Sequence, residues 1–227
     1  TTAAIAGGLA GAYWGWRGIP RTWLRRMRGR EVATPLVDRL VETAGWRTST
    51  SHPLRIDRLD LSGLDGLQTS PGGLGITFLP GKKRSGWTGP WWRDLDLDLA
   101  ALRAANVDTL FLLVEDDELD DCLVEDIEEV MADAGPELIR FPVRDPRTPL
   151  PHQEGPYRAA VRDLVDRVRR GQFVAIACRG GLDRSGMTAA CFLREAGLPA
   201  DEAIDRVHRA RRSSLTYPEQ VDYVRGW

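Results

Sequence analysis

The chain has 227 residues and a formal net charge of −2, from 31 basic and 33 acidic side chains. This balance excludes a general nucleic-acid-binding protein, which carries a clear basic excess. The length suits one domain of about 170 residues with a smaller additional segment. Three cysteines are too few for a disulfide framework, so they favour a reducing cytoplasmic location.

The first 50 residues predict a helical extension. Residues 3–16 are mostly small or apolar, and a segment rich in arginine follows that predicts a second helix with a solvated face. The apolar stretch is too short to span a bilayer, so we expect no membrane span. The polar, turn-rich residues 45–53 predict a linker. We therefore expect two parts, an extension at residues 1–50 and a larger domain at residues 51–227.

The larger domain alternates predicted strands and helices. Apolar or alternating runs predict strands at residues 54–61, 76–79, 107–114, 138–143 and 173–177. Other runs predict helices at residues 94–105, 115–134, 155–171, 185–196, 200–212 and 218–226. This alternation predicts an α/β fold with a central, mostly parallel sheet flanked by helices, and a site at the carboxyl ends of the strands.

Two further groups of residues leave their roles open. The basic run Lys82-Lys-Arg84 precedes Trp87, Trp91 and Trp92. One interpretation is contact with a substrate phosphate or a partner, and the other is ordinary packing of the tryptophans. The three histidines show no metal-ligand spacing, so we predict neither a metal nor a cofactor.

The segment that carries the chemistry joins the last predicted strand to the helix after it. Cys178 closes the strand, and Arg184 lies six positions later in the first helical turn. Cysteine attacks as the thiolate, and inward-facing amides of a strand-to-helix loop stabilise an anion. Arg184 adds a planar fork of charged donors for phosphate oxygens. Ser185 can donate a hydrogen bond to the sulfur when the sulfur leaves.

We predict that this loop binds phosphate. Two adjacent glycines suit its tight backbone curl. The predicted phosphate-binding residues are Arg179, Gly180, Gly181, Leu182, Asp183 and Arg184. The alternative interpretation is that Cys178 is simply a buried cysteine at a strand end, the commonest fate of a free cysteine. Neither Cys122 nor Cys191 has an arginine six positions later.

A second candidate catalytic residue follows the strand predicted at residues 138–143. Asp145 lies in a loop rich in proline. A carboxylic acid there can protonate the leaving oxygen and then, as the carboxylate, activate the hydrolytic water. The alternative is an ordinary turn aspartate before a proline.

Three motifs in order along the chain resemble the cyclin-dependent kinase inhibitor 3 family, which includes the kinase-associated phosphatases. They are Gly75-Ile-Thr-Phe-Leu-Pro-Gly-Lys82, Phe141-Pro-Val-Arg-Asp-Pro-Arg-Thr-Pro149 and Cys178-Arg-Gly-Gly-Leu-Asp-Arg-Ser-Gly186. The resemblance spans about residues 54–226. It implies a dual-specificity phosphatase fold, a phosphocysteine intermediate and a general acid at Asp145.

Two residues depart from that family. Ala177 stands where the family has a histidine that orients and activates the cysteine. Asp183 stands where the family has glycine, and a carboxylate there repels a dianion unless it is protonated or turned away. A similar Asp-Arg pair occurs in some phosphoinositide phosphatases and bacterial triple-specificity phosphatases, where the aspartate is a candidate acid. Two candidate acids therefore compete, and we favour Asp145.

The first 45 residues are similar to the C-terminal end of ADP-ribosylglycohydrolases. The resemblance rests on Thr1-Thr-Ala-Ala-Ile-Ala-Gly-Gly-Leu-Ala-Gly-Ala-Tyr-Trp-Gly15 and Ile19-Pro-Arg-Thr-Trp-Leu24. In that family the run follows an Asp-x-Asp magnesium motif, so the chain is expected to be the end of a fusion with an upstream hydrolase domain. Thr1 or Thr2 would be the sole remaining ligand, and we predict no metal binding. The alternative is a helix that merely packs on the larger domain.

The leading hypothesis is a cytoplasmic phosphatase whose partner is a phosphorylated protein, with action on phosphotyrosine and on phosphoserine or phosphothreonine. Asp183 prompts a second hypothesis, hydrolysis of phosphoinositides or another small phosphate ester. Ala177 and Asp183 together prompt a third, a phosphate-binding module with little turnover. A fourth, a fragment of an ADP-ribose hydrolase, predicts no such activity for this chain alone.

Overall fold

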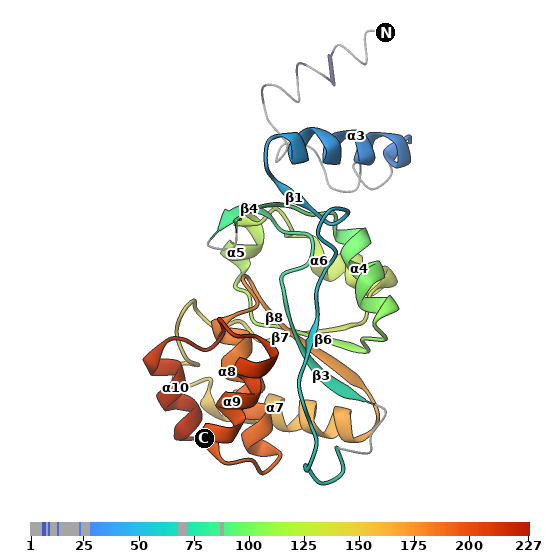
Figure 1. Ribbon diagram of the computed structural model, residues 1–227. Coiled ribbons are helices and arrows are strands. Elements are labelled where there is room, and N and C mark those ends of the chain that lie inside the picture. Colours follow the sequence, from blue (N-terminus) through green and yellow to red (C-terminus); the bar gives the residue numbers. More distant parts are fainter. Residues whose placement is uncertain are drawn as a thin grey trace. The chain divides into compact units, whose positions relative to one another are not determined.

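The computed structural model describes residues 28–67, 72–86 and 89–227, together with residues 6, 7, 9, 13 and 23 (Figure 1). The chain divides into two compact units, Thr1–Trp46 and Arg47–Trp227. In the first unit, α3 (Arg30–Thr43) is a helix that begins after Gly29, whose backbone is left-handed with φ of 80°. The interpretations of residues 3–16 and of Thr1 and Thr2 fall outside the described residues, apart from the few named above.

A five-stranded sheet forms the centre of the second unit. Its strand order is β2 (Asp57–Arg58), β3 (Gly73–Phe78), β8 (Phe173–Cys178), β6 (Thr109–Leu112) and β7 (Glu137–Arg140). β2 runs antiparallel to β3, and the other neighbours pair in parallel. All six residues of β8 are buried, as expected for an apolar strand covered on both faces. The predicted α/β fold with a mostly parallel central sheet is confirmed.

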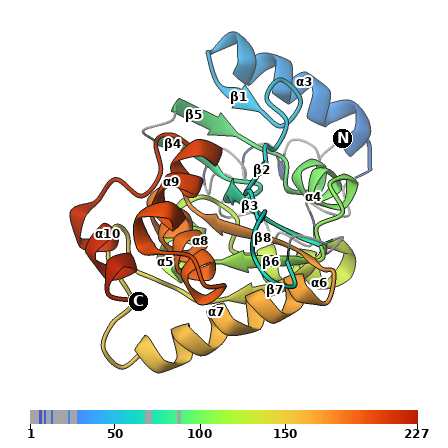
Figure 2. The ribbon, with the colours of Figure 1, turned by 60° about the horizontal axis from the view of Figure 1, so that its bottom comes forward.

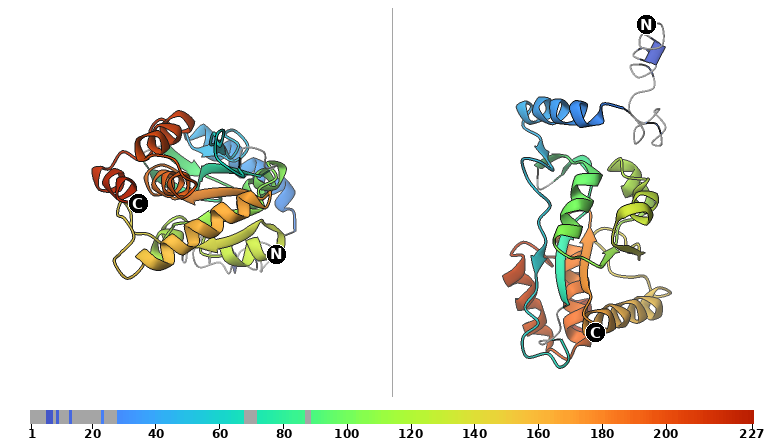
Figure 3. Two further views of the ribbon diagram at one scale, coloured as in Figure 1. Left: turned by 90° about the horizontal axis from the view of Figure 1, so that it is seen from below. Right: turned by 90° about the vertical axis from the view of Figure 1, so that its right-hand side faces the viewer.

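Helices cover both faces of this sheet (Figures 2 and 3). One group consists of α7 (Glu154–Arg169), α8 (Asp183–Glu195), α9 (Ala200–Ala210) and α10 (Pro218–Arg225). The other consists of α4 (Leu95–Ala104), α5 (Asp116–Asp121) and α6 (Ile127–Ala134). Because side chains alternate along a strand, Val174 and Ile176 of β8 pack with the first group, and Ala175 and Ala177 pack with the second.

The second unit also contains a small sheet that the sequence did not predict. Its order is β1 (Arg47–Thr48), β5 (Gly89–Trp92) and β4 (Lys83–Gly86), with β4 antiparallel to β5. Glycines, a proline and cations interrupt the apolar alternation that marks a strand, so the sequence of these short strands does not predict them. Trp91 is buried on β5, whereas Trp87 lies outside the described residues.

The acidic stretch at residues 115–134 forms two helices, so the prediction of one continuous helix was wrong. α5 ends at Asp121, and Leu123 then adopts a left-handed backbone with φ of 56°. This turn carries Val124 and Ile127 into the core, where both are almost completely buried. Burial of these two side chains outweighs the helix-forming tendency of the acidic run.

No helix among the described residues combines the length and the apolar character needed to cross a bilayer. The same residues hold no group of three or more histidine, cysteine, aspartate or glutamate side chains arranged to bind a metal ion.

Candidate active site

Cys178 ends the central strand β8, at the carboxyl edge of the sheet. Its neighbours in the sheet are β3 and β6, and α8 begins five residues later at Asp183. The Cys178 side chain is 3% exposed. Its sulfur lies 3.4 Å from the hydroxyl oxygen of Ser185, in the first turn of α8. The two residues that the sequence assigned to the nucleophile and its hydroxyl donor therefore lie in contact.

The loop between Cys178 and Arg184 is held in a tight curl. Gly181 has a left-handed backbone with φ of 65°, and an added Cβ would lie 2.5 Å from the carbonyl oxygen of Thr77. No residue with a side chain fits there without a shift of β3. Sequence reasoning assigned this glycine to the loop curl, and the close approach of β3 is the physical reason for it.

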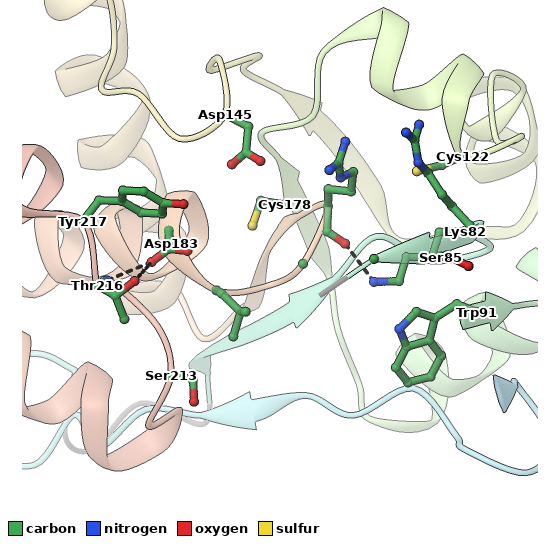
Figure 4. A pocket seen from close by; sticks show the side chains of 15 residues that line it. Lys82, Ser85, Trp91, Cys122, Asp145, Cys178, Asp183, Ser213, Thr216 and Tyr217 are labelled. Atoms are coloured by element: carbon green, nitrogen blue, oxygen red, sulfur yellow. Dashed lines mark hydrogen bonds between the residues drawn. The ribbon is translucent and has the colours of Figure 1, made fainter. Parts of the chain in front are cut away.

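Two cations outside the motif hold the carbonyl groups of this loop. The Lys82 ammonium donates a hydrogen bond of 3.0 Å to the carbonyl of Arg179 (Figure 4). Arg211 donates one of 3.5 Å to the carbonyl of Gly180. A trans peptide directs its N–H opposite to its C=O. The amides of Gly180 and Gly181 are thereby turned away from these cations, which suits an anion-binding nest.

Arg184 is completely buried and hydrogen-bonded to several groups. Its two terminal nitrogens donate to the two carboxylate oxygens of Glu118, at 2.6 and 2.8 Å. One of them also donates to the carbonyls of Leu113 and Val143. Burial alone disfavours the charged guanidinium, but hydrogen bonds to Glu118 and nearby negative groups outweigh it, and the pKa of Arg184 is raised. The fork is fixed and charged before any ligand arrives.

Glu118 is a residue of this site that sequence reasoning missed. It lies in the first turn of α5, where its carboxylate also accepts a hydrogen bond of 3.1 Å from the amide of Glu115. The two glutamates form a reciprocal capping box at the start of α5. The Glu-x-x-Glu spacing is the sequence signal for this helix start, but it carries no sign that the second glutamate reaches Arg184.

The two candidate acids lie in different surroundings. Asp145 is half-exposed, and one carboxylate oxygen lies 3.1 Å from Nε of Arg184. Figure 4 shows its side chain above Cys178. Asp183 instead accepts two hydrogen bonds on one oxygen, from the amide and hydroxyl of Thr216, at 2.8 and 2.9 Å. The Asp183 carboxylate is thereby turned toward the segment that precedes α10.

A pocket of about 310 Å³ opens over Cys178. Figure 4 shows two opposed walls, one with Lys82, Ser85 and Trp91 and the other with Thr216 and Tyr217. The sequence-predicted residues among its lining are Asp145, Cys178, Arg179, Gly180, Leu182 and Asp183. The remaining lining residues are Lys82, Arg84, Ser85, Gly86, Trp91, Cys122, Ser213, Thr216 and Tyr217.

The other two cysteines, Cys122 and Cys191, are buried thiols. Burial raises the pKa of the Cys122 thiol and raises that of Cys191 well above its ordinary value. Both therefore stay protonated near neutral pH. Cys191 packs in the core beside α7, away from the pocket lining.

Lys82 is a buried cation at the edge of this pocket. Its side chain is 5% exposed, and its ammonium lies 4.5 Å from the Phe78 ring and 5.3 Å from the Trp91 ring. Burial lowers the pKa of Lys82 to about 8, although Cys122 and Cys178 act in the opposite direction. A charge kept in such a place costs folding free energy, which points to a functional role.

Replacement of Lys82 by methionine is expected to increase stability by about 1–2 kcal/mol at pH 7. Below pH 8 the ammonium is charged in both states, so its burial cost is present in full. Between pH 8 and 10.5 the folded state loses the proton first, so the wild type gains stability as pH rises. Urea unfolding of both proteins from pH 7 to 10 measures the difference. If the difference in free energy of unfolding between the two proteins does not change with pH, Lys82 is not a buried cation with a lowered pKa.

Solved structures with a similar fold include several phosphatases. A kinase-associated phosphatase, with its catalytic-site cysteine replaced by serine, matches with a TM-score of 0.66 and 23% identity over 76% of this chain and 92% of that chain. The chain has the fold of the dual-specificity phosphatases. The phosphatase Tk-PTP in its active form matches with a TM-score of 0.53 and 25% identity, over 75% of this chain and 95% of that one.

Sequence comparisons add two shorter matches. The putative tyrosine phosphatase 067L of Invertebrate iridescent virus 3 is 39% identical over 59 residues, or 26% of this chain. The match spans a quarter of the length of that curated relative. Residues 1–50 match the ADP-ribosylglycohydrolase family.

Proposed function

We propose that the chain is a cysteine-dependent protein phosphatase that hydrolyses phosphotyrosine, and also phosphoserine and phosphothreonine, through a phosphocysteine intermediate. The observation that carries the proposal is that Cys178 lines a pocket, contacts the hydroxyl of Ser185 and lies near enough to the Glu118-bound guanidinium of Arg184 to interact with it electrostatically. The names of the similar proteins support the reaction class. The three cysteines are free and buried, which suits the proposed cytoplasmic location.

The reaction has two steps. In the first, the Cys178 thiolate attacks phosphorus, the bond from phosphorus to the ester oxygen breaks, and Asp145 gives its proton to that oxygen. In the second, the Asp145 carboxylate takes a proton from water as the water attacks phosphorus. The S–P bond breaks, inorganic phosphate forms, and Ser185 donates a hydrogen bond to the leaving thiolate. Arg184 and the loop amides stabilise the charge on the phosphoryl oxygens in both steps.

Asp145→Asn is expected to slow phenyl phosphate hydrolysis about 100-fold, because a phenolate leaves poorly without a proton. The loss with para-nitrophenyl phosphate should be smaller than about tenfold, because nitrophenolate needs little protonation. Initial rates across a series of aryl phosphates measure this dependence on the leaving group. Asp183→Asn is the matched control and should show no such dependence. If Asp183→Asn shows it and Asp145→Asn does not, the acid is Asp183.

Phosphoinositides or other small phosphate esters are the alternative substrates. That hypothesis rested on Asp183, whose carboxylate accepts hydrogen bonds from Thr216. Phosphate release from phosphotyrosine, phosphoserine and phosphothreonine peptides, beside phosphoinositide vesicles, separates the two. Faster turnover of the vesicles would overturn the protein assignment. Tight phosphate binding without turnover would favour a binding module.

The match of residues 1–50 supports the interpretation that this segment is the end of an ADP-ribosylglycohydrolase domain. The proposed partner is the remainder of such a domain, located upstream in the same protein. We expect no hydrolysis of ADP-ribosylated substrates by this chain alone.

A further inference from the structure

Positive charge is concentrated on one wall of the pocket. Lys82 and Arg84 come from β4 and the residue before it, and Arg179 extends from the phosphate-binding loop. The opposite wall holds hydroxyl groups, from Ser213, Thr216 and Tyr217. Figure 4 shows Lys82 on one side of Cys178 and Thr216 and Tyr217 on the other.

Two of these three cations have an acidic neighbour, and Lys82 is bonded to a neutral carbonyl. Arg84 pairs with Asp121 at the surface. Arg179 lies 3.7 Å from Glu118, but both oxygens of that carboxylate already accept hydrogen bonds from Arg184. The Lys82 ammonium makes one hydrogen bond within the described part of the chain, to a neutral carbonyl. Since an ammonium has three N–H groups, two remain for a ligand.

β4 forms the outer edge of its sheet beside this wall. The amide of Lys83 points outward and donates to the carbonyl of Cys122. Two residues further, Ser85 presents its amide and carbonyl on the same edge, because strand geometry repeats every second residue. Pro90 stands opposite Ser85 on β5 and has no amide to share. An extended peptide can therefore pair with Ser85 as an added strand.

We propose that this wall is a second anion subsite, and that the preferred substrate is an acidic phosphopeptide. The phosphorylated side chain enters the pocket over Cys178, and an anionic side chain within two residues of it contacts Arg84, Arg179 and Lys82. The peptide main chain lies along the edge of β4. The inference rests on the proposed phosphatase function and adds a sequence preference to it.

Two peptides test this preference. They share a central phosphotyrosine and carry either glutamate or glutamine at the two positions on each side. The wild type is expected to hydrolyse the glutamate peptide with a kcat/KM about tenfold higher at low salt. The advantage should nearly vanish in about 1 M salt, where charges are screened over about 3 Å.

Arg84→Gln should reduce the tenfold advantage to less than about threefold, and Arg84→Glu should reverse it. Arg84 is a surface residue, so thermal unfolding is expected to stay close to that of the wild type. Arg170→Gln is the matched control. It removes the same charge from an exposed residue that directly follows α7, and it should keep the full preference for the glutamate peptide.

The outcomes separate the two proposals. Equal kcat/KM values for both peptides, with normal turnover, would overturn the subsite and leave the phosphatase intact. Absence of turnover on either peptide would overturn the phosphatase. In that case, binding of both peptides to the Cys178→Ser variant still tests the subsite, since equal affinities would exclude it. Faster hydrolysis of a soluble inositol bisphosphate than of the acidic peptide would exclude a peptide as the occupant.

Discussion

Cys178→Ser is expected to abolish phosphate release, with kcat lowered by about 10⁴-fold or more, the scale of loss when a catalytic nucleophile is removed. A serine hydroxyl is nearly isosteric with the thiol but stays protonated near neutral pH, so it supplies almost no anionic nucleophile. Cys178 is 3% exposed at the end of a fully buried strand, and the substitution adds no volume there. Release of phosphate from a phosphotyrosine peptide measures the loss.

The same variant should still bind phosphate. The loop amides, the clamped Arg184 and the second cation Lys82 are unchanged by the substitution, so affinity for a phosphopeptide should stay within about tenfold of the wild-type KM. Cys191→Ala is the matched control, because this cysteine packs in the core and does not line the pocket. It should retain most of the wild-type turnover. Retention of more than about 1% of kcat in Cys178→Ser would exclude Cys178 as the nucleophile.

The sequence predicted the parts of this site that are local in the chain. The nucleophile, the loop glycines and Ser185 lie within eight consecutive residues, and one strand-to-helix turn brings them together. The α/β order was equally readable, because β3, β6 and β8 are apolar runs buried on both faces. Assignment of catalytic roles to these residues stays a prediction.

The parts that depend on distant contacts could not be predicted. Glu118 is 66 positions from Arg184, and Arg211 is 31 positions from Gly180. Nothing in an acidic helix start or a helix C-terminus indicates such partners. Lys82 was noted as a candidate phosphate contact, but its hydrogen bond to a loop carbonyl emerges only when β3 and β8 pair.

The choice between the two acids shows the same limit. Asp183 is adjacent to Arg184 in sequence, so it appeared to compete for the pocket. The amide of Thr216, 33 positions along the chain, instead donates a hydrogen bond to the Asp183 carboxylate. Asp145 is 39 positions from Arg184, yet its carboxylate lies 3.1 Å from Nε of Arg184. The reason is that the amide of Val143 donates a hydrogen bond to the carbonyl of Leu113, just after β6. Sheet register decides which carboxylate approaches the guanidinium.

Arg184→Met is expected to lower kcat/KM by about 10³-fold and also to destabilise the protein by about 3–5 kcal/mol. The loss of activity follows from the loss of the forked donor to the phosphoryl oxygens. The loss of stability follows from Glu118, which is 8% exposed and would keep its charge with only Arg179, 3.7 Å away, as a cationic neighbour. Phosphopeptide kinetics and urea unfolding measure the two effects separately.

The double variant Arg184→Met/Glu118→Met separates chemistry from folding. Apolar side chains of similar size replace a buried ion pair at little cost in stability, so the double variant should recover most of the free energy of unfolding. Its activity should stay as low as that of the single variant, because no guanidinium meets the phosphate. Recovery of activity together with stability would mean that Arg184 supports the fold and does not bind the substrate. Recovery of stability alone would assign Glu118 to holding the arginine in place, and Arg184 to the reaction.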